Sequence, residues 1–179
     1  WLKNTVTIRS KTWARFKNSY IQKLINTDFN PSKLQKLVLK ILTLSGPISE
    51  FKLTKLLYLV DYYYLQNYGR LLTNSFYIRA YEGPVPAGFD KQLNEMIQRG
   101  ILSKDFKIYI LKKQYKITFS KVEDEAINFV ISKYMSKNDR EIKTITYMTT
   151  PMRKILKLEK KMNKGMLWKP VFSEDDFNK

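Results

Sequence analysis

The 179-residue chain contains no cysteine and no histidine, and each absence excludes a class of site. Without cysteine the chain forms no disulfide, which fits the reducing cytoplasm where we expect the protein to work. Structural zinc sites take cysteine or histidine ligands, and Ser-His-Asp or Cys-His catalysis needs an imidazole, so these sites are excluded. Acid–base catalysis would be left to Asp, Glu, Lys or Tyr. We predict no metal, no cofactor and no enzymatic activity.

Long hydrophobic runs are also lacking, and no segment approaches the length of a membrane span. The start of the chain shows no signal-peptide pattern. We therefore expect no membrane partner. The sequence patterns predict no particular oligomeric state.

Arginine is scarce, although the net charge is +17. A charge of this size suits nucleic acid, an anionic membrane or an acidic protein as a partner, but guanidinium groups are the preferred ligands of phosphate. The alternative is that an AT-rich genome produced a composition rich in Lys, Asn, Ile, Tyr and Phe without selection for binding. Both explanations stay open.

Apolar side chains are abundant: 44% of residues are hydrophobic and 14% are aromatic, which predicts a folded domain. Helical spacing and capping residues predict a mainly α-helical protein. The expected helices begin or end at these residues: Asn30-Pro31 to Gly46, Ser49 to Gly69, a helix ending at Gly100, Lys121 to Asn138-Asp139, 141–147, and one restarting at Thr150-Pro151. The helix after Ser49 is apolar on two sides and should be central.

A small β element is expected between these helices. Residues 75–80 alternate like a strand, Gly83–Pro86 should form a turn, and 106–111 with 114–119 should form a hairpin around Lys112 and Lys113. Two helices, a third helix and a β-wing make an α+β, winged-helix-like domain. Such a domain either places its third helix in a DNA groove or docks on protein.

Two basic flanks surround the predicted domain of residues 30–156. Residues 1–29 form an amphipathic arm, in which Trp13, Phe16 and Tyr20 recur at helical spacing beside Arg15. This arm packs on its own domain or on a partner. Residues 157–179 form a basic tail that is either a solvated segment or a contact for an acidic partner.

Asp61 and a set of lysines are the side chains that could carry function. Asp61 lies inside an apolar helix, so it is either a base or binding acid, or is held by Arg70, by Arg79 or by a tyrosine hydroxyl. The hairpin lysines either contact nucleic-acid phosphates or are solvated; they are Lys104, Lys107, Lys112, Lys113 and Lys116.

The stretch 55–89 reads KLLYLVDYYYLQNYGRLLTNSFYIRAYEGPVPAGF and resembles the Panacea, or SocA-like, antitoxin domain. The residues that carry the resemblance are Lys55, Leu56, Leu57, Tyr58, Asp61, Tyr68, Gly69, Arg70, Tyr77, Gly83, Pro84, Val85 and Pro86. Members of that family often carry a Thr-His and then a Pro-Trp pair, where this chain has Thr146-Tyr147 and Pro151-Met152.

The resemblance implies a mainly α-helical domain whose motif residues are mostly structural. It also implies an antitoxin that neutralises, by direct binding, a protein toxin encoded by a neighbouring gene, in bacteria or their phages. In such proteins the flanks commonly carry partner specificity, which favours Trp13, Arg15, Phe16 and Tyr20 as partner contacts. Because the net charge is +17, DNA binding or autoregulation stays open as the alternative function.

Overall fold

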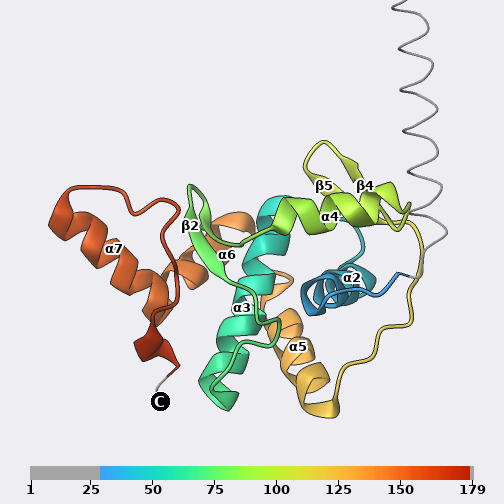
Figure 1. The fold of residues 1–179 in the computed structure, drawn as a ribbon, viewed down its shortest axis with the longest axis horizontal. Helices are drawn as coiled ribbons and strands as arrows, with labels where there is room; N and C mark the ends of the chain where they lie inside the picture. Colours follow the sequence, from blue (N-terminus) through green and yellow to red (C-terminus); the bar gives the residue numbers. More distant parts are fainter. Residues whose placement is uncertain (1–28, 178–179) are drawn as a thin grey trace, which may run out of the picture.

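The computed structural model describes residues 29–177. In this range the chain forms six α-helices and five short strands, and the β4–β5 hairpin (residues 102–111) lies at the edge of the molecule (Figure 1). The elements are α2 (Lys33–Ser45), β1 (Ile48–Ser49), α3 (Glu50–Tyr68), β2 (Tyr77–Ala80), β3 (Gly83–Pro86), α4 (Phe89–Gln98), β4 (Leu102–Asp105), β5 (Ile108–Leu111), α5 (Lys121–Tyr134), α6 (Asp139–Tyr147), α7 (Thr150–Met162) and a 3₁₀ turn at Glu174–Asp176. The predicted class, mainly α with a small β element, is confirmed.

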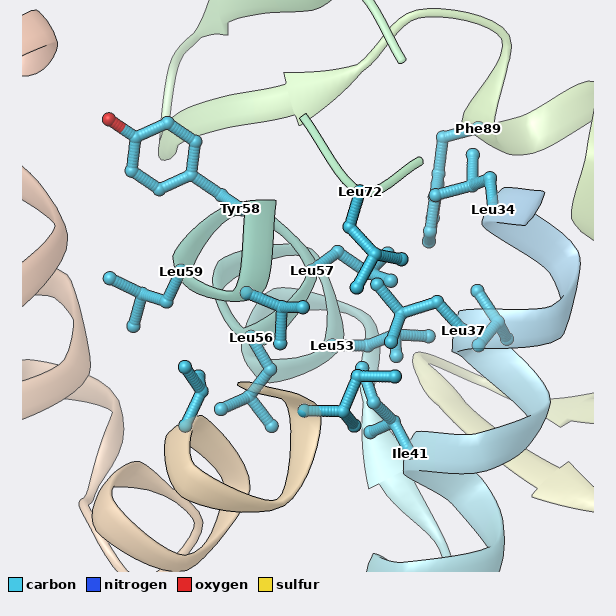
Figure 2. Close-up of a cluster of buried hydrophobic side chains, with 14 of the residues drawn as sticks. Leu34, Leu37, Ile41, Leu53, Leu56, Leu57, Tyr58, Leu59, Leu72 and Phe89 are labelled. Atoms are coloured by element: carbon cyan, nitrogen blue, oxygen red, sulfur yellow. The ribbon is translucent and has the colours of Figure 1, made fainter. Parts of the chain in front are cut away.

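Helix α3 runs through the centre of the molecule and packs against α2, α5, α6, β1 and β3 (Figure 1). Leucines point from it in several directions into the core, with Leu37 and Ile41 of α2 on one side (Figure 2). The predicted central, two-sided helix is confirmed. It also carries two charged side chains into the interior, Lys55 and Asp61.

Most helix boundaries follow from local capping. Ser49 caps α3, Gly69 ends it in the left-handed conformation, and Ser120 caps α5. The predicted start at Asn30-Pro31 was wrong, because α2 begins at Lys33. Ser32 and Gln35 form a capping box there: the Ser32 hydroxyl accepts from the Gln35 N–H, and the Gln35 side chain accepts from the Ser32 N–H.

Apart from β2 and β3, the described elements from α2 to β5 follow the order of a winged helix, which is α2, β1, α3, α4, β4 and β5. Strand β1 pairs with β5, which pairs with β4, so the strand between the first two helices joins the wing. Helix α4 occupies the place of the third helix. Strands β2 and β3 form a separate hairpin inserted between α3 and α4.

The predicted wing was wrong in its position along the chain. Its strands are β4 and β5, joined by a two-residue turn at Phe106-Lys107, and residues 114–119 form no strand. Phe106 has φ of 52° in that turn, a conformation for which Gly, Asn and Asp are the usual residues. Because phenylalanine is not a typical residue for such a turn, the sequence pattern did not indicate one here, and the hairpin was predicted too late in the chain.

The predicted turn at Gly83–Pro86 was also wrong. These residues form β3 and pair with β2, from Tyr77 opposite Pro86 to Ala80 opposite Gly83. Within residues 29–177, β3 has β2 as its only partner strand, and at such an edge a missing proline N–H leaves no ladder bond unmade.

The segment after α7 returns to the domain and extends the same hairpin. Ile78 forms a bridge with Pro170, flanked by backbone hydrogen bonds from Arg79 N to Lys169 O and from Val171 N to Tyr77 O, each 2.9 Å. The boundary predicted at residue 156 falls inside α7, and the division into arm, domain and tail stays a prediction. No helix between residues 29 and 177 is long and apolar enough to cross a membrane.

Candidate functional site

Asp61 lies on α3 with no exposed surface and accepts hydrogen bonds from two side chains of the following segment. Tyr77 Oη donates to Oδ2 at 2.8 Å, the Thr73 backbone N–H donates to Oδ1 at 2.8 Å, and the Thr73 hydroxyl donates to Oδ2. Of the predicted partners of Asp61, a tyrosine hydroxyl is therefore the one that is present. The guanidinium groups lie elsewhere, since Arg70 contacts Tyr64 and Arg79 pairs with Glu159.

Burial raises the pKa of Asp61 to about 6, although the hydrogen bonds from Thr73 and Tyr77 act in the opposite direction. The carboxylate accepts all of these hydrogen bonds and is fully enclosed by protein atoms. It fixes the loop after α3 to the start of β2, because Thr73 precedes that strand and Tyr77 begins it. This geometry suits a structural role.

Lys55 is the second buried charge on α3, with 1% of its surface exposed. Its Nζ lies 3.3 Å from Thr54 Oγ1 and 4.9 Å from the centre of the Phe51 ring. None of the ion pairs within residues 29–177 includes Lys55. Burial lowers its pKa to about 8, and the nearby Glu82 carboxylate only partly compensates.

Gly83 and Tyr147 enclose the Lys55 side chain. A Cβ atom on Gly83 would lie 3.1 Å from Tyr147 Cε2 and 3.2 Å from Lys55 Cε, and the φ of 110° at Gly83 already favours glycine. Tyr147 stands at the position where the resemblance expects histidine. Motif residues that are far apart in sequence therefore meet at one place.

Arg79, which lies on β2, is next to the Tyr147 ring beside Lys55. Its guanidinium donates to Tyr147 Oη at 3.2 Å and lies over the same ring, 5.4 Å from its centre. Its Nε is 3.3 Å from Glu159 Oε1, close enough for an ion pair but poorly aligned for a hydrogen bond. Arg79 thus connects the β2–β3 hairpin to α6 and α7.

Lys55 lines a pocket of about 430 Å³ between α3, the β2–β3 hairpin and the start of α4. Trp168 and Tyr81 stand at its rim, 61% and 71% exposed, with their rings edge to face at a centroid distance of 6.2 Å. Neither aromatic residue was among the predicted site residues. The one available signal was the group of apolar residues within the polar tail, which are Met166, Leu167, Trp168, Val171 and Phe172.

The predicted nucleic-acid lysines are spread along the wing and the chain after it. Lys104 is in β4, where it pairs with Glu50 at 2.5 Å, and Lys107 is in the turn and lines the pocket. Lys112, Lys113 and Lys116 follow β5 and are exposed. Their role in binding stays a prediction.

The other predicted contacts lie at the start of the chain. Trp13, Arg15, Phe16 and Tyr20 are outside the described residues. The Tyr68-Gly69-Arg70 motif ends α3, where Arg70 lies over the Tyr64 ring. Residues 29–177 contain no cluster of three or more acidic side chains that could hold a metal ion.

A family comparison matches residues 53–151 to the family described as Antitoxin SocA-like, Panacea domain. This range begins in α3 and ends at the start of α7, so it includes Lys55, Asp61, Gly83 and Tyr147. Comparisons with curated proteins and with solved structures find no match. Since the matched range covers more than half of the chain, the protein belongs to the SocA-like antitoxin family with a Panacea domain.

Proposed function

We propose that the protein is a non-catalytic antitoxin that neutralises a partner toxin by binding it directly. The observation that carries the proposal is the family match over residues 53–151. The surroundings of Asp61 support it, because an acid that accepts hydrogen bonds from Thr73 and Tyr77 and has no exposed surface offers no base to a substrate.

The basic arm of residues 1–29 is proposed to contact the toxin. Trp13, Phe16 and Tyr20 would supply aromatic contact area, and Arg15 a hydrogen-bonding cation, the residue types that dominate binding energy at interfaces. The cytoplasm, where toxin and antitoxin would be made together, is the proposed location.

The test is co-expression with the product of the neighbouring gene, followed by growth measurement and affinity capture of the tagged full chain. We expect growth to be rescued and the two proteins to be captured in fixed stoichiometry. Replacing Trp13, Phe16 and Tyr20 by alanine should abolish rescue while leaving the melting temperature unchanged. Absence of both capture and rescue in a folded sample would refute the proposal.

DNA binding is the second candidate, favoured by the winged-helix order of the strands. The charge distribution argues against the usual docking mode. Helix α4, which would enter the groove, carries Asp90 and Glu95 with Lys91 as its one cation. A helix with this balance is not attracted by phosphates.

The matching experiment is a salt titration with duplex DNA. If the wing and arm bind DNA, affinity should fall by about a thousandfold or more between 50 and 200 mM salt, as expected for roughly six or more phosphate contacts. Absence of binding at low salt would remove this candidate.

A further inference from the structure

The ammonium group of Lys55 has hydrogen-bonding capacity that the described protein does not use. An ammonium carries three N–H donors, and within residues 29–177 the one acceptor in reach is Thr54 Oγ1, at a long 3.3 Å. That hydroxyl in turn donates to the backbone oxygen of Phe51. A buried cation with unused donors is unfavourable, so what the site lacks is an oxygen acceptor.

The pocket above Lys55 has room for such a group. Its volume of about 430 Å³ accommodates one or two side chains, and its walls are mostly apolar, from Phe51, Ile78, Val85 and Phe89. The aromatic pair at the rim, Trp168 and Tyr81, could pack against whatever surrounds the inserted group. Tryptophan and tyrosine at the edge of a pocket are typical of binding hot spots.

Trp168 is held in this position at the expense of backbone strain. Its φ is 66°, in the left-handed region that bulky residues rarely adopt. The Trp168 N–H donates to Arg79 O at 2.7 Å, next to the bridge between Ile78 and Pro170. A strained backbone that presents an exposed tryptophan is typical of a functional site.

The charges around the pocket leave a site for an anion. Among the lining residues, Glu50 and Glu82 are each neutralised by a lysine, at 2.5 Å from Lys104 and 2.7 Å from Lys143. Lys104 and Lys143 lie outside the lining, which itself holds three carboxylates, the third being Asp90, and two ammonium groups, those of Lys55 and Lys107. None of the ion pairs within residues 29–177 includes either of these lining lysines, and Lys55 is the buried one while Lys107 is exposed.

We propose that this pocket receives an acidic side chain of the toxin, whose carboxylate accepts hydrogen bonds from Lys55 while Trp168 and Tyr81 pack on the residues beside it. This inference rests on the proposed antitoxin function and adds a second contact to the predicted arm. An acidic occupant complements the net charge of +17.

The test measures the affinity of the full chain for the product of the neighbouring gene by titration calorimetry. Lys55→Met keeps the length of the side chain and removes its charge, and Trp168→Ala removes half of the aromatic pair. Each should weaken binding by roughly thirtyfold or more. The control is Phe76→Ala, an aromatic residue of similar exposure (56%) that lines a different pocket and should change affinity less than about threefold.

A carbodiimide, which joins an amine to a carboxylate in direct contact, tests the chemistry of the occupant. In the complex we expect an amide between Lys55 and an Asp or Glu of the toxin, detected by mass spectrometry and missing from Lys55→Met. Cross-links of other lysines without Lys55 would overturn the acidic occupant.

The outcomes separate the two proposals. Wild-type capture and rescue with unchanged affinity for both variants would overturn the pocket and leave the antitoxin function standing. A loss of affinity confined to Phe76→Ala would also overturn the proposal that the pocket binds the toxin. Failure of the wild type to bind the toxin would overturn both, and weakened duplex DNA binding by Lys55→Met and Trp168→Ala would assign the pocket to nucleic acid instead.

Discussion

Helix α3 buries two opposite charges less than two turns apart, and their surroundings differ. Asp61 accepts hydrogen bonds from Thr73 and Tyr77 on both of its oxygens. Lys55 has one long hydrogen bond and opens toward a pocket. Burial shifts both pKa values toward the neutral form. The comparison indicates that a fully partnered buried charge serves the fold, whereas an incompletely partnered one is available to bind.

The largest effect should come from Asp61→Ala. The substitution leaves the Tyr77 hydroxyl and the Thr73 N–H without their acceptor, which should lower the free energy of unfolding by about 3 kcal/mol. Urea unfolding measures this. Asp105→Ala, at an exposed acid in β4, is the control and should be neutral within about 0.5 kcal/mol. Equal effects of the two substitutions would contradict a structural role for Asp61.

Gly83→Ala should be the next most disruptive change. The new Cβ would contact Tyr147 and Lys55 at 3.1 and 3.2 Å on a backbone with positive φ, so we expect a loss of about 2 kcal/mol. Gly100→Ala is the matched control, since Gly100 also has a positive φ, of 67°, but its Cβ would meet no atom within 4 Å. Thermal unfolding of both variants would show the difference, and similar melting temperatures would mean that the enclosure of Lys55 is loose.

Lys55→Met should instead stabilise the protein. The free energy of unfolding should rise by about 1 kcal/mol or more at pH 7, because the substitution replaces an incompletely partnered buried charge. Between pH 8 and 10.5 the unfolded chain holds the lysine proton more tightly than the folded protein does. Wild-type stability should therefore rise relative to Lys55→Met across that range.

The other charged groups around Lys55, which are Glu82, Arg79 and Lys143, are present in both proteins. Their titration therefore cancels in the difference between the two unfolding curves. A gap in stability that stayed constant from pH 7 to pH 10.5 would show that the ammonium is well solvated in the folded state.

Trp168→Asn should have the smallest effect on stability. Asparagine tolerates positive φ better than tryptophan, and the lost side chain is 61% exposed, so the free energy of unfolding should stay within about 1 kcal/mol of wild type. Toxin affinity should nevertheless fall as for Trp168→Ala. A large loss of stability would instead assign Trp168 to the packing of the C-terminal segment.

The predicted elements that the structure confirms are those whose sequence signals are local. Ser49 and Gly69 delimit α3, because capping uses side chains within three or four residues of the helix end, and the predicted start of α5 at Lys121 is confirmed. The predictions were wrong at the two hairpins. There a phenylalanine takes a positive φ at Phe106, and two prolines form an edge strand in β3, so tertiary packing overrides residue preference.

The candidate site was predicted only in part. Lys55 and Gly83 were marked by the family motif, and the tyrosine hydrogen bond of Asp61 was among the predicted alternatives. The neighbours Arg79 and Trp168 were not placed there, since no local pattern connects a strand residue to a tail residue that pairs with it much later in the chain.

The sequence by itself determined the helical class, the central helix and the membership in an antitoxin family, because periodicity, capping and motif spacing are properties of neighbouring residues. The tertiary structure alone decided that Lys55, Gly83, Tyr147 and Trp168 share one place. Their meeting depends on the path of the chain through β2, α6 and the returning C-terminal segment. That path follows from which apolar faces bury one another across the whole domain.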